Sequence, residues 1–187
     1  MTVANTTDYA GIQKAIVDWL KAYGGVSQVL YADTETPRPA KPYATVLFTT
    51  RGVRTGFDEE RPSFVGAVIQ RVTTGPRQLV VQAEVYTDPA TSAATAEADR
   101  LLEGALLALD TVPVMDAFRA VKLGFLSHSS IARLDEIFGN RWERRAACDL
   151  TFCYSGETFD DGGAGSGNWI ETVQVPDETN GHATYDP

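Results

Sequence analysis

The run WERRAACDLTFCY at residues 142–154 constrains the fold most, because apolar and polar side chains alternate along it. The residues expected on one face are Trp142, Ala146, Cys148, Leu150, Phe152 and Tyr154, and those expected on the other are Glu143, Arg145, Asp149 and Thr151. A period of two is typical of a β-strand, whose successive side chains point to opposite sides. The chain is therefore expected to fold around a sheet with one covered face and one wet face.

Other runs predict further strands at residues 44–50, 64–74 and 78–87, with shorter ones at 29–32 and 122–127. The Gly75-Pro76 pair between two of these runs indicates a hairpin turn. The charged stretch RGVRTGFDEERPS at 51–63 is expected to be a long exposed hairpin loop, and the proline-rich PRPAKPY at 37–43 an extended lead-in.

Two amphipathic patterns predict the principal helices. The first begins near Asp8, a suitable N-cap, and ends at Gly24-Gly25; the second runs from about 92 to 109 with Thr91 or Ser92 as its cap. A short helix is expected at 112–121. Because helices are too few to cover both faces of a parallel sheet, the order favours an α+β fold with a mainly antiparallel sheet and two principal helices on one side.

The net charge is unevenly distributed. The 187 residues hold 25 acidic and 16 basic residues, a formal charge of −9, yet residues 156–187 hold seven acidic residues and no Lys or Arg. The glycine-rich DDGGAGSGN at 160–168 predicts a linker, and WIETVQV at 169–175 a further strand. We therefore expect a domain at 1–155 and an acidic arm at 156–187. The overall charge argues against a general binder of polyanions.

Signals for catalysis or metal binding are weak. His128, Ser129 or Ser130, and Asp135 are the residue types of a hydrolase, but they lie in a polar stretch of ordinary turn composition. Walker A, GxSxG and HExxH motifs are absent from the sequence, and its histidines and cysteines form no zinc pattern, so no catalytic residue, metal or cofactor is predicted.

The cysteines and the hydropathy bear on the compartment. Cys148 and Cys153 are about 16 Å apart along one strand, too far to bridge, and two free thiols favour a reducing compartment. Neither a membrane-spanning segment nor a signal peptide is expected.

Four arginines form a cluster of mixed charge with Asp135, Glu136 and Glu143; they are Arg133, Arg141, Arg144 and Arg145. In a monomer this pattern is typical of a salt-bridged, exposed strand entrance. In a protein that assembles, the same surface is suited to an acidic partner, such as the acidic arm of another copy.

The ordered features resemble the phage neck or tail terminator family. They are the N-terminal helix with Trp19, PRPAKPY before the first major strand, the hairpin sheet, the Ala/Leu-rich helix, the strand RWERRAACDLTFCY and the terminal IETVQV, which together span most of residues 8–175. The resemblance implies a structural virion protein without catalytic residues. It would form a ring, six-fold in related terminators, that caps the head-proximal end of the tail tube and joins it to the head connector.

The resemblance also implies the partners. They are further copies of the chain, the tail tube protein and connector or adaptor proteins, while DNA passes without specific binding; the protein would be made in the host cytoplasm and reside in the virion neck. Residues 169–175, with Trp169, Ile170, Val173 and Val175, are expected to add a strand to a neighbour's sheet edge or to pair in their own sheet. The alternatives are a head-tail adaptor, a tail tube protein, or a small hydrolase or ligand-binding domain using His128.

Overall fold

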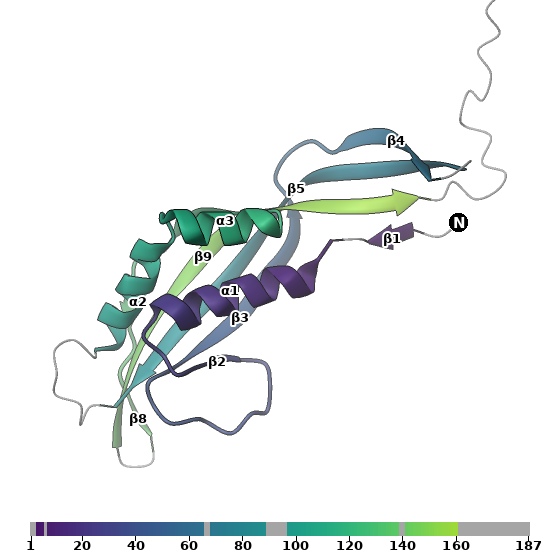
Figure 1. The fold of residues 1–187 in the computed structure, drawn as a ribbon. Helices are drawn as coiled ribbons and strands as arrows, with labels where there is room; N and C mark the ends of the chain where they lie inside the picture. The colour runs from purple at the N-terminus through teal and green to yellow at the C-terminus, as the bar shows by residue number, and fades with distance from the viewer. Residues whose placement is uncertain (1–2, 6, 66–67, 89–96, 139–140, 161–187) are drawn as a thin grey trace, which may run out of the picture.

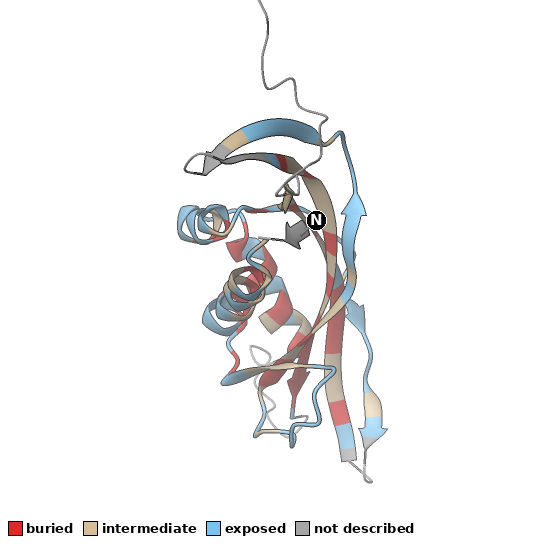
Figure 2. Ribbon diagram, turned by 90° about the vertical axis from the view of Figure 1, so that its right-hand side faces the viewer, coloured by how far each residue is buried: buried red, intermediate tan, exposed pale blue. Residues whose placement is uncertain are grey.

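A computed structural model describes residues 3–5, 7–65, 68–88, 97–138 and 141–160. It shows one long, twisted and mainly antiparallel sheet with three helices on one face (Figures 1 and 2). The predicted α+β architecture is therefore confirmed, with the short helix after the second principal one as the third.

Two strands of 20 residues form the centre of the sheet. They are β5 (Val68–Thr87) and β9 (Arg141–Asp160), which pair antiparallel from Arg71 opposite Asp160 to Thr87 opposite Arg144. The other edge of β5 pairs in succession with β3 (Tyr43–Arg54) and β4 (Glu59–Val65), and β2 (Gln28–Tyr31) lies parallel to β3.

The other edge of β9 pairs with four short strands: β1 (Val3–Asn5), β6 (Leu123–His128), β7 (Ala132–Arg133) and β8 (Glu136–Phe138). Strand β1 lies opposite Thr158–Asp160, so the start of the described chain lies beside the end of β9 (Figure 1).

The helices are α1 (Tyr9–Tyr23), α2 (Ala98–Ala108) and α3 (Val112–Ala120). Asp8 caps α1 as predicted, since its Oδ1 accepts a hydrogen bond from the Gly11 N–H at 2.8 Å. Gly25, with φ of 59°, provides the left-handed residue after the helix. The predicted cap of the second helix at Thr91 or Ser92 lies outside the described residues.

The core lies between the helices and one face of the sheet (Figure 2). It receives Ile12, Ile16, Trp19 and Leu20 from α1, Leu79, Val81, Ala83 and Val85 from β5, and Ala146, Cys148, Leu150, Phe152 and Tyr154 from β9. The alternation predicted for residues 146–154 is thus confirmed. The Trp19 Nε1–H donates to the Ala105 carbonyl at 3.1 Å, which ties α1 to α2.

The predicted hairpin turn at Gly75-Pro76 is wrong, because both residues lie inside the continuous strand β5. The Pro76 carbonyl accepts from the Thr55 N–H at 3.2 Å, so the edge of Pro76 that lacks an N–H faces the connection at 55–58. At that position β3 has ended and β4 has not begun, so the sheet loses no hydrogen bond.

Two further boundaries differ from the prediction because the paired strands are longer than expected. The expected loop at 51–63 is mostly strand, with only residues 55–58 between β3 and β4, and the hairpin instead closes where Val65 pairs with Val68. Residues 156–160, assigned to the arm, continue β9. The expected strand at 169–175 lies outside the described residues.

Candidate assembly surface

The hairpin of β8 and β9 extends beyond the end of β5 and carries exposed apolar side chains. Ile137 lies opposite Trp142, and their exposed fractions are 64% and 59%. The last residue of β5 that pairs with β9 is Thr87, opposite Arg144, so no β5 residue supports this pair. Trp142 was predicted on the core side of its strand. It does lie on the face of β9 that carries the core residues, but at a position past the end of the core, where it is exposed.

The four predicted arginines are distributed over both faces of this end. The Arg144 guanidinium contacts Glu97 at 3.1 Å, whereas Arg145, on the opposite face of β9, contacts the Glu84 carboxylate at 3.0 and 2.5 Å. Arg133 pairs with Asp135 at 3.2 Å. Arg141 lies opposite Phe138, and its side chain is outside the described part of the structure. Each arginine whose side chain is described thus has an acidic partner in its own chain, and a role between subunits stays a prediction.

Sequence reasoning missed a second ionic group at this end. Glu143 was expected on the wet side of its strand, but its exposed fraction is 2%, and its carboxylate contacts Arg38 at 3.0 Å and Lys41 at 2.6 Å. Both cations come from the proline-rich segment. Their presence in an otherwise apolar stretch is the signal that could have indicated an acidic partner.

On the face of the sheet away from the helices, aromatic rings enclose the Glu84–Arg145 pair. The Tyr43 and Tyr86 rings stack at 4.8 Å, the Arg145 guanidinium lies 5.5 Å from the Tyr86 ring centre, and the Tyr86 hydroxyl donates to Glu84 at 2.5 Å. The hydrogen bonds to Glu84 raise the pKa of Arg145, and burial raises the pKa of Tyr86, with Glu84 adding to that rise. This network fixes the base of the projecting hairpin in one geometry.

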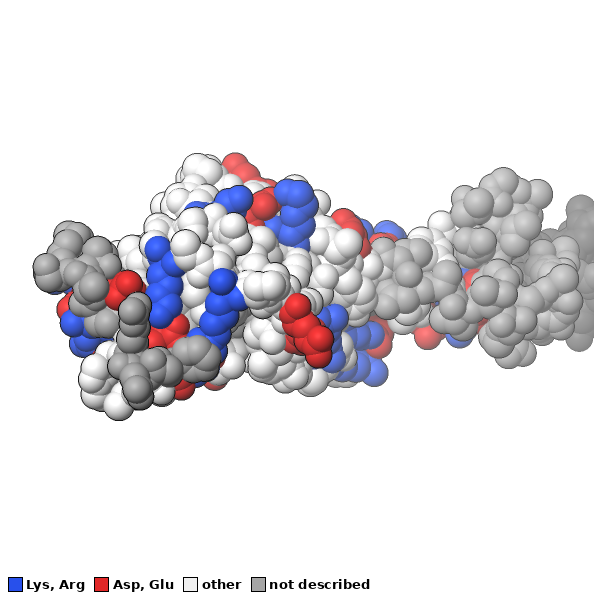
Figure 3. Space-filling view, turned by 90° about the horizontal axis from the view of Figure 1, so that it is seen from below, with Lys and Arg blue, Asp and Glu red and all other residues white. Residues whose placement is uncertain are grey.

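Seen from below, the end of the molecule shows basic and acidic side chains interspersed (Figure 3). Apolar residues on a projecting hairpin surrounded by mixed charges are typical of a protein interface, in which an apolar centre is ringed by polar groups. The arrangement is suited to binding a protein.

The residues proposed for hydrolysis are engaged in other contacts. His128 Nδ1 lies 2.8 Å from the Ser129 carbonyl oxygen, the Ser129 hydroxyl accepts from the Asp149 N–H at 2.9 Å, and Asp135 contacts Arg133. The structure thus does not join them into a nucleophile, base and acid relay.

Neither a metal centre nor a membrane-spanning helix is found among the described residues. No group of three or more His, Cys, Asp or Glu residues among them is arranged to hold a metal ion. None of the described helices has the length and apolarity to cross a membrane.

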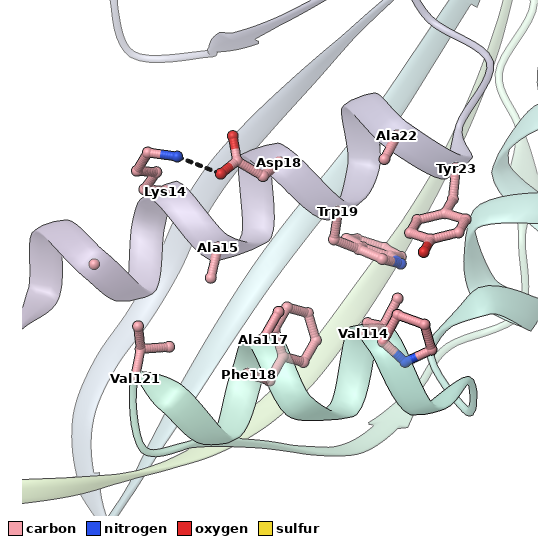
Figure 4. Close-up of a pocket in the computed structure, with 12 residues that line it drawn as sticks. Lys14, Ala15, Asp18, Trp19, Ala22, Tyr23, Val114, Ala117, Phe118 and Val121 are labelled. Carbon is pink, nitrogen blue, oxygen red and sulfur yellow. Dashed lines mark hydrogen bonds and ion pairs between the residues drawn. The ribbon is translucent and has the colours of Figure 1, made fainter.

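A second apolar surface lies between α1 and α3, where a groove of about 400 Å³ separates the two helices (Figure 4). Trp19 and Phe118 meet edge to face at its base, with ring centres 6.5 Å apart. On the α1 side of the groove, Lys14 forms an ion pair with Asp18 (Figure 4).

The chain is an α+β protein with exposed apolar side chains at one end of its sheet. The family model of the phage neck terminator protein matches residues 10–182, and the chain belongs to that family, which is a structural one. The resemblance inferred from the sequence is confirmed.

Other comparisons gave only remote similarity. No curated protein matches the chain. A solved structure described as the virion of a native gene transfer agent (GTA) particle is 18% identical over 81% of this chain and 99% of that chain, with a TM-score of 0.29. A second solved chain, whose description names no function, is 16% identical over 78% of this chain and 91% of that chain, with a TM-score of 0.37.

Proposed function

We propose that the protein forms a ring that caps the head-proximal end of a phage tail tube and joins the tail to the neck. Membership of the neck terminator family supports a structural role at this place in the virion. The observation that carries the proposal is the exposed Ile137–Trp142 pair on the projecting β8–β9 hairpin. A large aromatic residue on a rigid element is the kind of anchor that contributes most to protein interfaces.

A head-to-tail contact explains why such a protein would make a ring. The hairpin lies at one end of the sheet. In a ring of more than two copies it must bind a different surface on the next copy, because a patch that binds itself gives only a two-fold pair. Contacts of this heterologous kind generate closed rings when the rotation between copies closes. We expect six copies, the number that the family resemblance implies.

The charges would set orientation at the contact and the behaviour toward DNA. Arg133 and Arg144 form partly exposed ion pairs near the apolar pair, and such ion pairs can exchange partners with a neighbour. Arg141 directly precedes Trp142, whereas Arg145 stays in its buried pair with Glu84. The ring would meet the tail tube protein on one side and connector or adaptor proteins on the other. The net charge of −9 opposes binding of the DNA that passes through.

The test is electron microscopy of phage particles that carry a peptide tag after Pro187, detected with a gold-labelled antibody. We expect label only at the head-proximal end of the tail, with a copy number of one ring per particle measured by quantitative mass spectrometry. Label along the whole tail would identify a tube protein, label that stays with tailless heads would identify a head-tail adaptor, and label at the distal end would contradict all three roles.

A further inference from the structure

The apolar groove between α1 and α3 has no partner within the described chain. Its walls are Ala15, Trp19 and Ala22 of α1 and Val114, Ala117 and Phe118 of α3 (Figure 4). Ala22 and Ala117 are exposed, and their small size keeps the groove open between the larger side chains. Apolar surface of this kind, framed by an exposed ion pair, marks a place where another apolar segment binds.

We infer that residues 169–175 of the same chain dock in this groove. The segment WIETVQV holds four large apolar side chains, Trp169, Ile170, Val173 and Val175, among 32 C-terminal residues that are otherwise rich in Gly, Asp and Glu. An aromatic residue followed by branched aliphatic residues matches the chemistry of the walls, which are alanine, valine and aromatic rings. The inference is independent of ring formation.

The groove lies close to the end of β9, the strand from which the C-terminal residues continue. Gly11 and Val121 line one end of it, and Lys122, the residue after Val121, pairs with Glu157 of β9 at 3.1 Å. The Glu157 N–H also donates to the Thr7 hydroxyl at 3.2 Å, just before α1. The groove therefore opens beside β9, three residues before its last residue, Asp160.

The connecting segment is long enough to make the return. The path from Asp160 back to Glu157 is about 10 Å at the rise of a strand. Residues 161–168 span up to roughly 26 Å when extended. A short linker of glycine-rich sequence holds a tethered segment at an effective concentration in the millimolar range, which favours docking within one chain over docking on another copy.

Two of the described sheet edges, those of β4 and β2, suit the segment less well. The outer edge of β4 includes Pro62, which has no N–H, so it cannot provide a complete hydrogen-bond ladder. The outer edge of β2 is four residues long, shorter than the seven-residue segment. The groove therefore matches the apolar character of the segment better than either edge.

The experiment uses the full-length protein labelled with 5-fluorotryptophan and observed by fluorine NMR. The chain has three tryptophans, Trp19, Trp142 and Trp169, and the variant Trp169→Phe assigns the third resonance. We expect the Trp169 resonance of the native protein to lie away from its position in urea. Ala117→Glu, which places a carboxylate in the groove, should return it to that position, while Ala120→Glu, at an exposed alanine of the same helix outside the groove, should leave it displaced.

Circular dichroism and a cooperative urea transition show whether each variant is folded, so a misfolded variant is recognised directly. A Trp169 resonance at the urea position in the native protein would overturn the inference. A displaced resonance that Ala117→Glu does not move would overturn it as well and would indicate another site, such as a sheet edge. A displacement that disappears on dilution would show docking on a second copy and would contradict docking within the chain. None of these results alters the electron microscopy test of the ring.

Discussion

Arg144 and Arg145 are adjacent in sequence but differ in what they stabilise. Arg145 pairs with Glu84, whose side chain is 9% exposed, whereas Arg144 pairs with Glu97, whose side chain is 29% exposed. Removing one partner of a buried pair leaves an uncompensated charge, while exposed pairs contribute little. The same residue type on opposite faces of one strand therefore has unequal structural importance.

This difference predicts unequal costs of substitution. We expect Arg145→Ala to lower the free energy of unfolding by about 3 kcal/mol, because Glu84 stays buried without its cation. The matched control Arg144→Ala should lower it by less than about 1 kcal/mol. Urea denaturation followed by circular dichroism measures both, and equal losses would show that the Glu84 network does not act as a buried pair.

Buried hydroxyl and thiol groups predict a loss of stability in alkali. Burial is the main cause that raises the pKa of Tyr43, Tyr86 and Tyr154 above the ordinary 10.0, and burial raises the pKa of the Cys148 thiol from 9.0 to about 12. The folded state thus holds these protons more tightly than the unfolded state, so the stabilisation is complete below pH 9 and decreases as pH rises above 9 to 10.

Urea titrations from pH 7 to 11.5 measure this effect. The free energy of unfolding should be constant from pH 7 to about pH 9 and fall progressively at higher pH. The fall should be shallower in Tyr86→Phe, which has one ionisable group fewer. A free energy that stays level or rises over the alkaline range would contradict the prediction.

At the scale of elements, two facing glycines in β5 and β9 make room for an ion pair beside the sheet. Gly75 of β5 lies opposite Gly156 of β9, and Arg77 reaches Asp58 in the β3–β4 connection at 2.6 Å. A Cβ on Gly75 would overlap the Asp58 carboxylate, and one on Gly156 would lie 2.8 Å from the Arg77 side chain. The absence of side chains here creates the space that the ion pair occupies.

Gly75→Ala should therefore displace Asp58 and destabilise the protein by about 2 kcal/mol, which lowers the melting temperature by roughly 6 °C. Gly124→Ala in β6 is the control, because its Cβ would make only an ordinary contact at 3.7 Å with the Cys153 carbonyl oxygen. Thermal unfolding followed by circular dichroism compares the two, and a Gly124→Ala variant at least as unstable as Gly75→Ala would refute the steric explanation.

The elements that local pattern alone specifies were predictable. The apolar spacing of α1 with Asp8 and Gly25 at its ends, and the alternation in β9 from Ala146 to Tyr154, both match the structure. The continuity of β5 through Gly75-Pro76 was not predictable, because the acceptability of a proline inside a strand depends on which neighbour is missing at that position. That information lies in the pairing of distant segments.

The candidate surface was predictable only in part. Arg141, Arg144 and Arg145 lie at the beginning of β9, but Arg133 lies in β7, and Arg144 and Arg145 are on opposite faces. The burial of Glu143 depends on Arg38 and Lys41, about 100 residues earlier in the chain. The exposure of Trp142 depends on where β5 ends rather than on the sequence of β9. Both properties follow from the extent of neighbouring strands, which the local alternation does not encode.

At the scale of the whole molecule, the exposed hairpin predicts a specific defect in assembly. Ile137→Ser combined with Trp142→Ser should reduce incorporation into phage particles by at least about tenfold if the pair anchors a contact between copies. Because both side chains are largely exposed, the melting temperature should stay near that of the native protein. Incorporation is measured by mass spectrometry of purified particles.

The matched control is Leu107→Ser on α2, a large apolar residue with an exposed fraction of 72%. We expect this variant to be incorporated normally, because surface leucines occurring singly need no partner. Normal incorporation of the double variant would show that the hairpin is not part of the ring contact. An equal loss of incorporation in the control would show that surface apolarity in general matters.

The paired strands β5 and β9 also have a mechanical consequence. Each has 20 residues and is about 65 Å long at the rise of a strand, and their pairing continues from Arg71 to Thr87 on β5. The hydrogen bonds of an antiparallel pair run perpendicular to the strands. A force that pulls the two ends of this ribbon apart along its length therefore loads these bonds together, in shear, instead of breaking them one after another. The ribbon that joins the β8–β9 hairpin to the opposite end of the sheet should therefore resist stretching along its axis.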